Sequence, residues 1–363
     1  MSRIPFLAVV AAVVALSFLW LVVRGRPLRG GEGVEPVLYA SGLHQPRGLS
    51  FGPDGVLYVA EAGWSGPGQA TVPGRVSAVG GRDQTEVRLD GLPAAGAAQP
   101  LFAQSGPGAL AADPAGTLLF LGPEDARPQG GLLRLPATGG AADPLALTPD
   151  GPGGAAPAAA VWGAALDPAG AGSAPAGAAA RTLSAVLPLA NLLVRVDPAT
   201  GRAVPVTPFI AAGGSNPLPT SVARHPDGTL VVTHFGAEPF PAAGQSPTGR
   251  VVQVAPDGRW QPVYEGLRFP IAAAFAPNGL LYVVEFASGY DAANRRFLPG
   301  SGRVLALGPE ARQRRTVIRD VDYPTAIAFS PAGDLYVTEG GVFRGPGEGR
   351  LLFVPAQTLL VAR

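Results

Sequence analysis

Three glutamates and one histidine occupy the same position in a repeated sequence pattern. Glu61, His234, Glu285 and Glu339 each end an apolar run, six residues after the glycine of a Pro-x-Gly turn. In the second repeat along the chain, the same position is occupied by Gly122. If the apolar runs are strands around one axis, the four side chains ring one mouth of a central channel. Such acids either bind a ligand there or hold the loop that follows their own strand.

An oxygen-rich ring of this kind is suited to a hard cation. Calcium takes six to eight oxygen ligands, so Glu61, Glu285 and Glu339 are candidate ligands for Ca²⁺. His234 has no evident partner in the sequence, and a lone histidine is more often a satisfied rim residue than a catalyst.

Arg47 and Tyr290 complete the set of candidate ligand-binding residues, beside Glu61, His234, Glu285 and Glu339. Arg47 opens a strand where other repeats have Thr220 and Thr325. Its guanidinium either projects into the channel, where it could meet an anionic group, or neutralises Glu61 of the same repeat.

Aromatic residues follow the same strands, namely Trp64, Phe235, Phe240, Phe286, Tyr290 and Phe343. A rim that mixes aromatic and arginine side chains is typical of protein or sugar contact surfaces. The alternative is that these rings cover their own loops. Long loops on a rigid scaffold are where binding groups concentrate, so this rim is the expected functional face.

Several function classes lack support in the sequence. There is no serine hydrolase elbow, zinc protease motif, phosphate-binding loop or dinucleotide fingerprint. The chain has no cysteine, which excludes disulfides, thiolate nucleophiles and iron-sulfur clusters. A net charge of +1 without a dense arginine stripe argues against nucleic acid as a partner.

The elements that carry these residues repeat six times. The turn glycines Gly55, Gly116, Gly170, Gly228, Gly279 and Gly333 are spaced 51 to 61 residues apart. Each unit reads as four strands: a small-residue run after a proline, a run such as "VLYVAE", a run that usually opens with Gly-Arg, and a polar outer run. Repeats of this length built only from strands predict an all-β, six-bladed β-propeller.

Counting strands also predicts how the ring closes. The last unit ends after its third strand, near Pro355, while "EPVLYASGL" (35–43) precedes the first unit as a spare outer strand. Pairing these two removes the exposed sheet edges. We therefore expect one propeller domain over 36–356, with a tether at 25–35, a tail at 357–363 and long loops between 137 and 180.

The amino terminus has the length of a membrane span. Residues 4–23 are free of charge and run directly into Arg24, which favours an uncleaved membrane anchor or signal over 1–24. Arg24, Arg26 and Arg29 outnumber Arg3, and the positive-inside rule would keep the body in the cytoplasm. Anchored propellers of this kind are mostly exported, so a periplasmic or cell-surface body is expected and a cytoplasmic one is the alternative.

The motifs as a group resemble the ScyD/ScyE family of exported propellers, which are related to NHL-type repeats. The resemblance covers 36–345. It rests on "GLHQPRGLSFGPDGVLYVAEAG", "ANLLVRVDPATG", "LPTSVARHPDGTLVV", "AEPFPAAGQSPTGRVVQV" and "YPTAIAFSPAGDLYVTEGG". It implies a propeller fold and a secreted or anchored setting, and it supplies no catalytic residue. The chain departs from the family pattern at His234, which replaces an acid, and at Gly122-Pro123.

Together these features predict a membrane-tethered propeller that binds an unknown small molecule or protein at its rim. The enzymatic alternative is a metal- or PQQ-assisted sugar dehydrogenase or a lactonase-like hydrolase, because similar six-bladed rings host such chemistry.

Overall fold

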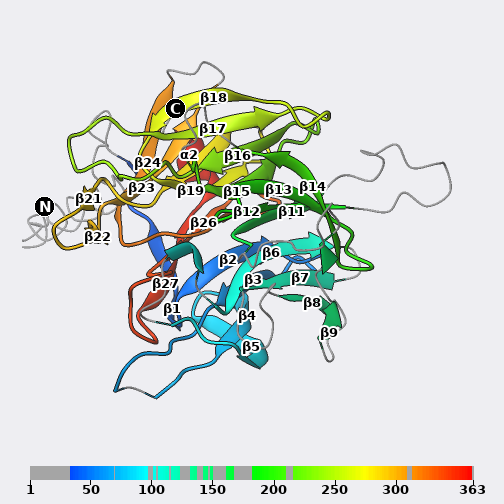
Figure 1. Ribbon diagram of the computed structural model, residues 1–363. Coiled ribbons are helices and arrows are strands. Elements are labelled where there is room, and N and C mark those ends of the chain that lie inside the picture. Colours follow the sequence, from blue (N-terminus) through cyan, green and yellow to red (C-terminus); the bar gives the residue numbers. More distant parts are fainter. Residues whose placement is uncertain are drawn as a thin grey trace, which may run out of the picture. The chain divides into compact units, whose positions relative to one another are not determined.

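The computed structural model (Figure 1) describes residues 33–68, 70–96, 101–103, 105–113, 116–122, 131–136, 142–145, 148–149, 161–166, 182–209, 216–308 and 313–361. The chain divides into two units, Met1–Gly33 and Val34–Arg363. The predicted anchor at 1–24, most of the tether and most of the 137–180 segment lie outside the described residues. Among those that are described, no helix is long and apolar enough to span a bilayer.

Strands dominate the described part of the second unit, and they form six blades around one axis. Blade 1 contains β2 (Pro46–Phe51), β3 (Leu57–Glu61), β4 (Gly74–Gly81) and β5 (Gln84–Leu92). Blade 2 contains β6 (Pro107–Asp113), β7 (Gly116–Leu121), β8 (Gly131–Pro136) and β9 (Asp143–Leu145). Blade 3 contains β11 (Gly163–Leu166), β12 (Leu183–Leu187), β13 (Leu192–Val196) and β14 (Arg202–Pro208), with β10 (Thr148–Pro149) parallel to β14.

The remaining blades repeat the same order from the axis outward. Blade 4 contains β15 (Pro219–Arg224), β16 (Leu230–His234), β17 (Gly249–Val254) and β18 (Trp260–Leu267). Blade 5 contains β19 (Pro270–Phe275), β20 (Leu281–Glu285), β23 (Gly302–Leu307) and β24 (Arg314–Val321), and its long loop carries the hairpin β21 (Tyr290–Asp291) and β22 (Arg296–Phe297). Blade 6 contains β25 (Ile327–Phe329), β26 (Leu335–Glu339), β27 (Gly349–Val354) and β1 (Val37–Leu43). A short 3-10 helix, η1 (Leu101–Ala103), precedes blade 2, and helix α2 (Ala356–Val361) follows blade 6.

Ring closure occurs as the strand count predicts. The first strand of the propeller, β1, pairs antiparallel with β27, with Val37 opposite Phe353 and Leu43 opposite Gly349. Tyr39 packs on Phe353 and Tyr336, with ring centroids 5.2 and 5.1 Å apart. The outer strand of blade 6 is therefore supplied by the start of the domain, as predicted.

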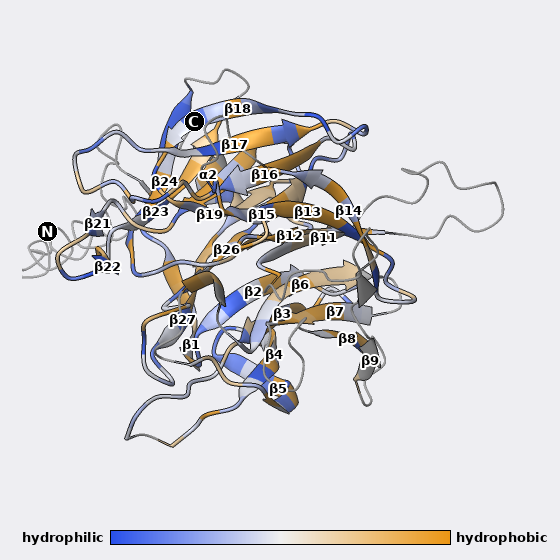
Figure 2. Ribbon diagram, viewed as in Figure 1, coloured by the Kyte–Doolittle hydropathy of each residue, from blue (hydrophilic) through white to orange (hydrophobic). Residues whose placement is uncertain are grey.

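Burial falls from the second strand of a blade to the fourth. All five residues of β3 are buried, whereas β5 is mostly exposed. The hydropathy colouring follows this gradient, because β7 is mostly hydrophobic while β5 and β18 are hydrophilic along much of their length (Figure 2). Apolar side chains of successive blades share core clusters, as Phe120 of β7 and Leu187 of β12 do. Because the faces of the blades pack against one another, polar groups that could contact a ligand come mainly from the loops at the two rims.

Candidate functional site

Glu61 marks the rim on which the second strand of each blade ends. Its carboxylate is fully buried and accepts hydrogen bonds from the backbone N of His44 (2.6 Å) and from Nε and Nη2 of Arg75 (2.9 Å each). His44 lies in the connection that enters blade 1, two residues before Pro46. The acid thus joins this connection to Arg75, the second residue of β4.

Blades 5 and 6 repeat this arrangement. Glu285 accepts the backbone N–H of Arg268 (2.7 Å) and pairs with Arg303, the second residue of β23. Glu339 accepts the backbone N–H of Asp322 (3.0 Å) and pairs with Arg350 (2.8 Å).

The contacts of the three acids correct two expectations. Each carboxylate holds the connection that leads into its blade, and not the loop that follows its own strand. Each is also already neutralised by an arginine of the same blade. Within the described residues, no group of three or more histidine or acidic side chains could hold a metal ion. Glu61, Glu285 and Glu339 are therefore not brought together as the calcium ligands expected from the sequence.

His234 occupies the same corner of blade 4 without a negative charge. Its Nδ1 lies 3.3 Å from Nε of Arg250, and its ring contacts Phe209 and Trp260 at centroid distances of 4.6 and 5.6 Å. Burial, aided by the positive charge of Arg250, lowers the pKa of His234 to about 3. No described residue is a hydrogen-bond partner for its Nε2. A neutral, fully buried imidazole in this setting is part of the core rather than a rim ligand.

Blades 2 and 3 have apolar pairs at this corner. In blade 2, Leu121 lies opposite Pro107 and Gly131, as Glu61 lies opposite Pro46 and Arg75 in blade 1. Leu187 pairs with Leu192 in blade 3. Gly122 is therefore not the counterpart of the acids, because the β6–β7 turn is shorter than the β2–β3 turn and shifts the count from the turn glycine.

Arg47 is buried near the mouth of the channel, with 4% of its surface exposed. It donates hydrogen bonds to the carbonyls of Gly341 (3.4 Å) and Ser105 (3.3 Å), and its guanidinium carbon lies 5.8 Å from the centre of the Trp162 ring. These residues belong to blade 6, to the entry into blade 2 and to the entry into blade 3. Burial lowers the pKa of Arg47 to about 9. Arg47 therefore projects toward the channel, and Arg75, not Arg47, pairs with Glu61.

The residue before the first-strand proline adopts a left-handed conformation in several blades. Gln45, Leu218, Phe269 and Tyr323 have φ values of 52°, 50°, 49° and 43°. Each carbonyl accepts a backbone N–H from just beyond the second strand of its blade, as Leu218 does from Phe235 (2.9 Å). All four side chains are buried. Because the acids hold the preceding residue, they help to position this ring of side chains under the rim loops.

An aromatic cavity of about 590 Å³ opens on this rim. Its lining comes from the long loops of blades 3 to 6 and from two connections between blades: Leu101, Phe102, Leu189, Asn216, Leu218, Glu238, Phe240, Tyr290, Arg295, Phe297 and Phe343. Seven of these eleven side chains are hydrocarbon, so the walls are apolar. A second cavity, of about 500 Å³, lies on the opposite rim beside the turns of blades 5 and 6 and helix α2.

Aromatic contacts join the loops that form the cavity walls. Phe240 of blade 4 contacts Tyr290 and Phe297 of blade 5, each at a centroid distance of 5.4 Å. Phe102 contacts Phe235, which lies fully buried beneath the rim. Phe343 of blade 6 contacts Tyr323 at 5.3 Å and is 43% exposed. The apolar walls are thus continuous with the core.

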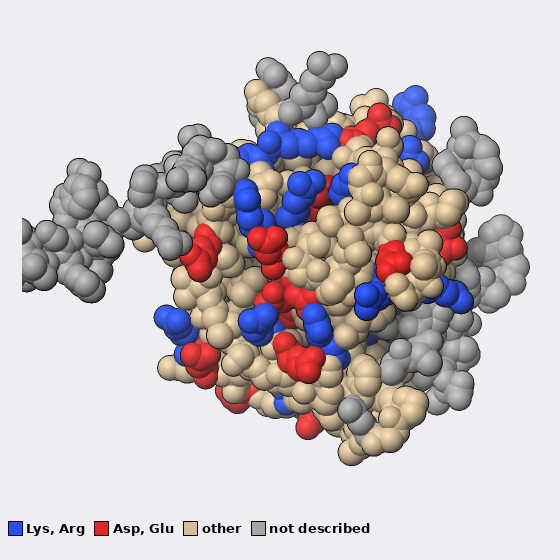
Figure 3. Space-filling model, turned by 90° about the vertical axis from the view of Figure 1, so that its left-hand side faces the viewer, with Lys and Arg blue, Asp and Glu red and all other residues tan. Residues whose placement is uncertain are grey.

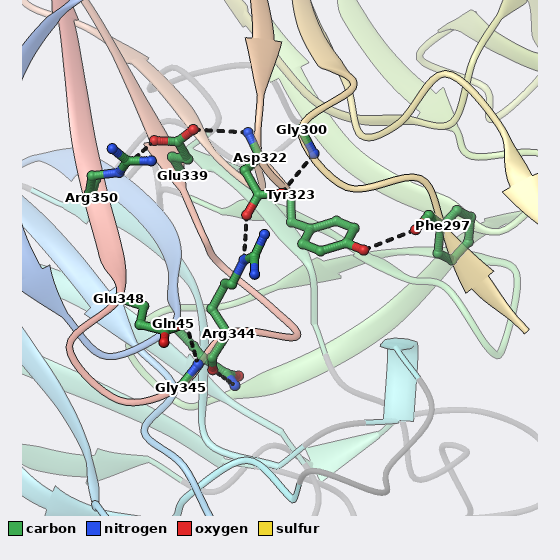
Figure 4. A network of polar contacts seen from close by, with 10 residues as sticks. All are labelled: Gln45, Phe297, Gly300, Asp322, Tyr323, Glu339, Arg344, Gly345, Glu348 and Arg350. Carbon is green, nitrogen blue, oxygen red and sulfur yellow. Dashed lines mark hydrogen bonds and ion pairs between the residues drawn. The ribbon is translucent and has the colours of Figure 1, made fainter. Parts of the chain in front are cut away.

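A polar network fixes the loops of blades 5 and 6 (Figure 4). Tyr323 donates its hydroxyl to the carbonyl of Phe297 (2.9 Å), and Asp322 accepts the N–H of Gly300 (2.7 Å) and Nε of Arg344 (2.5 Å). Gln45 donates to the carbonyl of Arg344 (2.9 Å), which ties the start of blade 1 to blade 6. On the side of the molecule where β21 and β22 lie, arginine and acidic side chains adjoin one another at several places among side chains of other kinds (Figure 3).

The predicted site residues divide between the cavity and the framework beneath it. Tyr290 lines the cavity, and Arg47, Glu61, His234, Glu285 and Glu339 do not. Of the other predicted rim aromatics, Phe240 and Phe343 line the cavity, Phe235 and Phe286 are fully buried, and Trp64 lies in its own loop, bridged to Val72.

Sequence reasoning missed several lining residues. Glu238 and Arg295 lie in the long loops "AEPFP" and "NRRF", whose length was the available signal. Phe102 lies between blades, where the repeat gives no guide.

Comparisons with known proteins support the fold. No protein family matches the chain, and neither does any curated protein. A putative oxidoreductase (glucose dehydrogenase) from Thermus thermophilus is similar in structure, with 21% identity, 89% of this chain and 100% of that chain covered, and a TM-score of 0.57. The PQQ-bound aldose sugar dehydrogenase of Streptomyces coelicolor has 13% identity, 91% and 99% coverage, and a TM-score of 0.53.

A protein of unknown function from Bacteroides thetaiotaomicron has 11% identity, 88% and 75% coverage, and a TM-score of 0.52. At these identities the likeness shows the fold alone. The chain is a six-bladed β-propeller, and its NHL-like character and its resemblance to the ScyD/ScyE family stay predictions.

Proposed function

We propose that this propeller is a ligand-binding module and that its site is the aromatic cavity on the rim of the long loops. The cavity itself is the observation that carries the proposal. Its volume of about 590 Å³ lies in the range of small-molecule sites, which are typically apolar with a few polar groups that fix orientation. Here those groups are Asn216, Glu238, Arg295 and the hydroxyl of Tyr290.

In the same proposal, residues 1–24 tether the propeller to a membrane, and the propeller is in the extracytoplasmic compartment. The charge-free run at 4–23 supports the tether. Protease treatment of intact cells tests the orientation. Digestion of the propeller in intact cells is the expected result, and full protection with digestion only after lysis would place the propeller in the cytoplasm.

The sugar dehydrogenase alternative rests on likeness of fold. PQQ carries three carboxylates, and burying them requires several cationic or hydrogen-bonding partners. The described lining of the cavity contains one cation, Arg295, and one anion, Glu238. These residues do not fit a tricarboxylate, and the described part of the chain assembles no calcium site.

A thermal-shift screen on the full-length chain tests the binding proposal. The panel contains short peptides, mono- and oligosaccharides, and PQQ with and without Ca²⁺. A ligand present at one hundred times its dissociation constant stabilises the folded state by about 2.7 kcal/mol. Leu189 lines the cavity and is 46% exposed, so Leu189→Trp fills part of the space without disturbing the core.

The matched control is Leu38→Trp on β1, where the leucine is 39% exposed. We expect the shift caused by a binding compound to persist in Leu38→Trp and to shrink or vanish in Leu189→Trp. A shift of equal size in both variants, or no shift with any compound, would contradict the proposal. A Leu189-sensitive shift with PQQ, together with aldose oxidation, would favour the dehydrogenase instead.

A further inference from the structure

The cavity carries two opposite charges beside one aromatic pair. Phe240 and Phe297 are in ring contact at 5.4 Å, and each follows a charged residue by two positions, Glu238 and Arg295 respectively. Both charged residues line the cavity and are exposed. Within the described chain, no hydrogen bond or ion pair joins their side chains to each other or to any other group.

Glu238 and Arg295 differ in this respect from the acidic side chains that hold the entries to blades 1, 5 and 6. Glu61, Glu285 and Glu339 are each matched to an arginine, and Asp322 is matched to Arg344. Glu238 and Arg295 are the two charged residues of the described cavity lining, and neither has such a partner within the described residues. A ligand that brings a cation to Glu238 and an anion to Arg295 would form charge-assisted hydrogen bonds at both ends.

The apolar walls of the cavity favour a ligand with an apolar body. Hydrocarbon side chains form most of the lining, and the amide oxygen of Asn216 already accepts the N–H of Leu218 (2.9 Å). A sugar would leave most of its hydroxyls without partners here, and each unsatisfied polar group costs free energy. An aromatic or aliphatic ligand group has no hydroxyls that would be left without hydrogen-bond partners in this cavity.

The aromatic rings also favour a cation beside Glu238, because Phe240 lies two residues after it in the same loop. Phe240 and Tyr290 contact each other at 5.4 Å, and ring faces attract ammonium groups in addition to a carboxylate. Arg295, in turn, offers the planar fork that suits a carboxylate.

We infer that the cavity takes a zwitterion with an apolar body, and specifically a short apolar peptide with free termini. Its ammonium group meets Glu238 and the rings of Phe240 and Tyr290, and its carboxylate meets Arg295. The volume of about 590 Å³ exceeds the needs of a single amino acid, which favours a peptide of a few residues. This inference rests on the proposed function and names the ligand class of the same site.

Calorimetric titration of the full-length chain with the tripeptide Phe-Ala-Phe tests the inference. Three further probes carry an acetylated amino terminus, an amidated carboxyl terminus, or both. The variants are Glu238→Gln and Arg295→Gln, with Glu86→Gln on β5 and Arg259→Gln in the turn before β18 as controls at exposed positions.

The free peptide is expected to bind the wild-type chain, and each blocked terminus to weaken binding by about tenfold or more, because bonds to charged groups are the strong ones. The effect of acetylation should shrink in Glu238→Gln, where the aromatic rings alone still meet the ammonium group, and keep its full size in Arg295→Gln. The effect of amidation should shrink in Arg295→Gln and keep its full size in Glu238→Gln. Both control variants should behave as the wild type does.

Equal affinities for free and blocked peptides, or an acetylation effect of undiminished size in Glu238→Gln, would overturn the inference. So would a failure of the wild-type chain to bind any of the peptides. If a compound of another class then gives a shift that Leu189→Trp abolishes, the binding module stands and only its ligand class is wrong. If no compound gives such a shift, the proposed function falls as well.

Discussion

In blade 4, Pro217 and His234 stand at the two positions where other blades join a backbone amide to a carboxylate by a hydrogen bond. Pro217 stands two residues before Pro219, at the position of His44, Arg268 and Asp322 in blades 1, 5 and 6. Those residues donate their backbone N–H to a glutamate, and proline has no N–H to donate. A buried carboxylate at 234 would lack this donor, whereas a neutral imidazole needs none. The proline thus accounts for the loss of the acid in blade 4.

This relationship predicts the effect of restoring the acid. His234→Glu should lower the free energy of unfolding by about 2 kcal/mol, because the new carboxylate is buried with Arg250 as its partner and without the amide. In the background of Pro217→Ala, which restores the N–H, the same change should cost at least about 0.5 kcal/mol less. Urea unfolding of the four proteins of this cycle measures the coupling, and strictly additive effects would contradict the explanation.

His234 also predicts a pH dependence of stability. Its folded pKa of about 3 lies below the unfolded value near 6.5, so the unfolded chain binds the proton first as pH falls. The stability contributed by the neutral ring is complete above pH 6.5 and is lost progressively between pH 6.5 and 3.

At about pH 5 this loss amounts to about 2 kcal/mol relative to about pH 8. His44, whose pKa is also lowered by burial, adds to the same slope. The variant His234→Gln does not titrate, so its stability should fall by about 2 kcal/mol less over this interval. Parallel pH profiles for the two proteins would show that His234 is protonated in the folded state.

Replacing a buried acid by its amide is expected to lower the free energy of unfolding by a large amount. Glu61→Gln removes the charge that faces Arg75 and leaves one oxygen to accept the bonds from His44 and Arg75, so it should cost about 3 kcal/mol. Glu86→Gln, in the exposed pair with Arg88, should change stability by less than about 0.5 kcal/mol. Chemical denaturation compares the two variants. A cost at Glu61 as small as that at Glu86 would show that the pair does not hold the entry to blade 1.

Much of the fold was predictable because its signals are local. A tight turn requires positive φ, and Gly55 (76°) and Gly228 (92°) supply it at fixed intervals. Ring closure followed from a count of strands, since β1 had no partner in blade 1 and β27 had none beyond it.

The role of the acids was present in the sequence but was misassigned. Arg75, Arg303 and Arg350 each follow the glycine that opens the third strand, in the same blades that have Glu61, Glu285 and Glu339. Reading the two positions together would have indicated ion pairs within blades. The cavity could not be derived in this way, because residues such as Glu238, Phe102 and Phe343 come from loops of different blades and share no period. Their proximity depends on the closed ring.

Closure itself predicts a difference between two truncated chains. A chain that begins at residue 33 retains β1 and should keep a cooperative thermal transition. A chain that begins at residue 45 loses β1, exposes the edge of β27 and removes the buried side chains of Ala40 and Leu43. We expect the shorter chain to melt at lower temperature or to aggregate. Circular dichroism and sedimentation velocity make the comparison, and identical behaviour of the two chains would mean that β1 does not close the ring.

A crystallographic screen in which crystals of the full-length chain are soaked with a library of small organic fragments tests the central claim most directly. The account predicts that fragments gather in the cavity between Phe240, Tyr290 and Phe343, with charged fragments directed at Glu238 or Arg295. Fragments that leave this cavity empty and gather instead beside helix α2 on the opposite rim would contradict it.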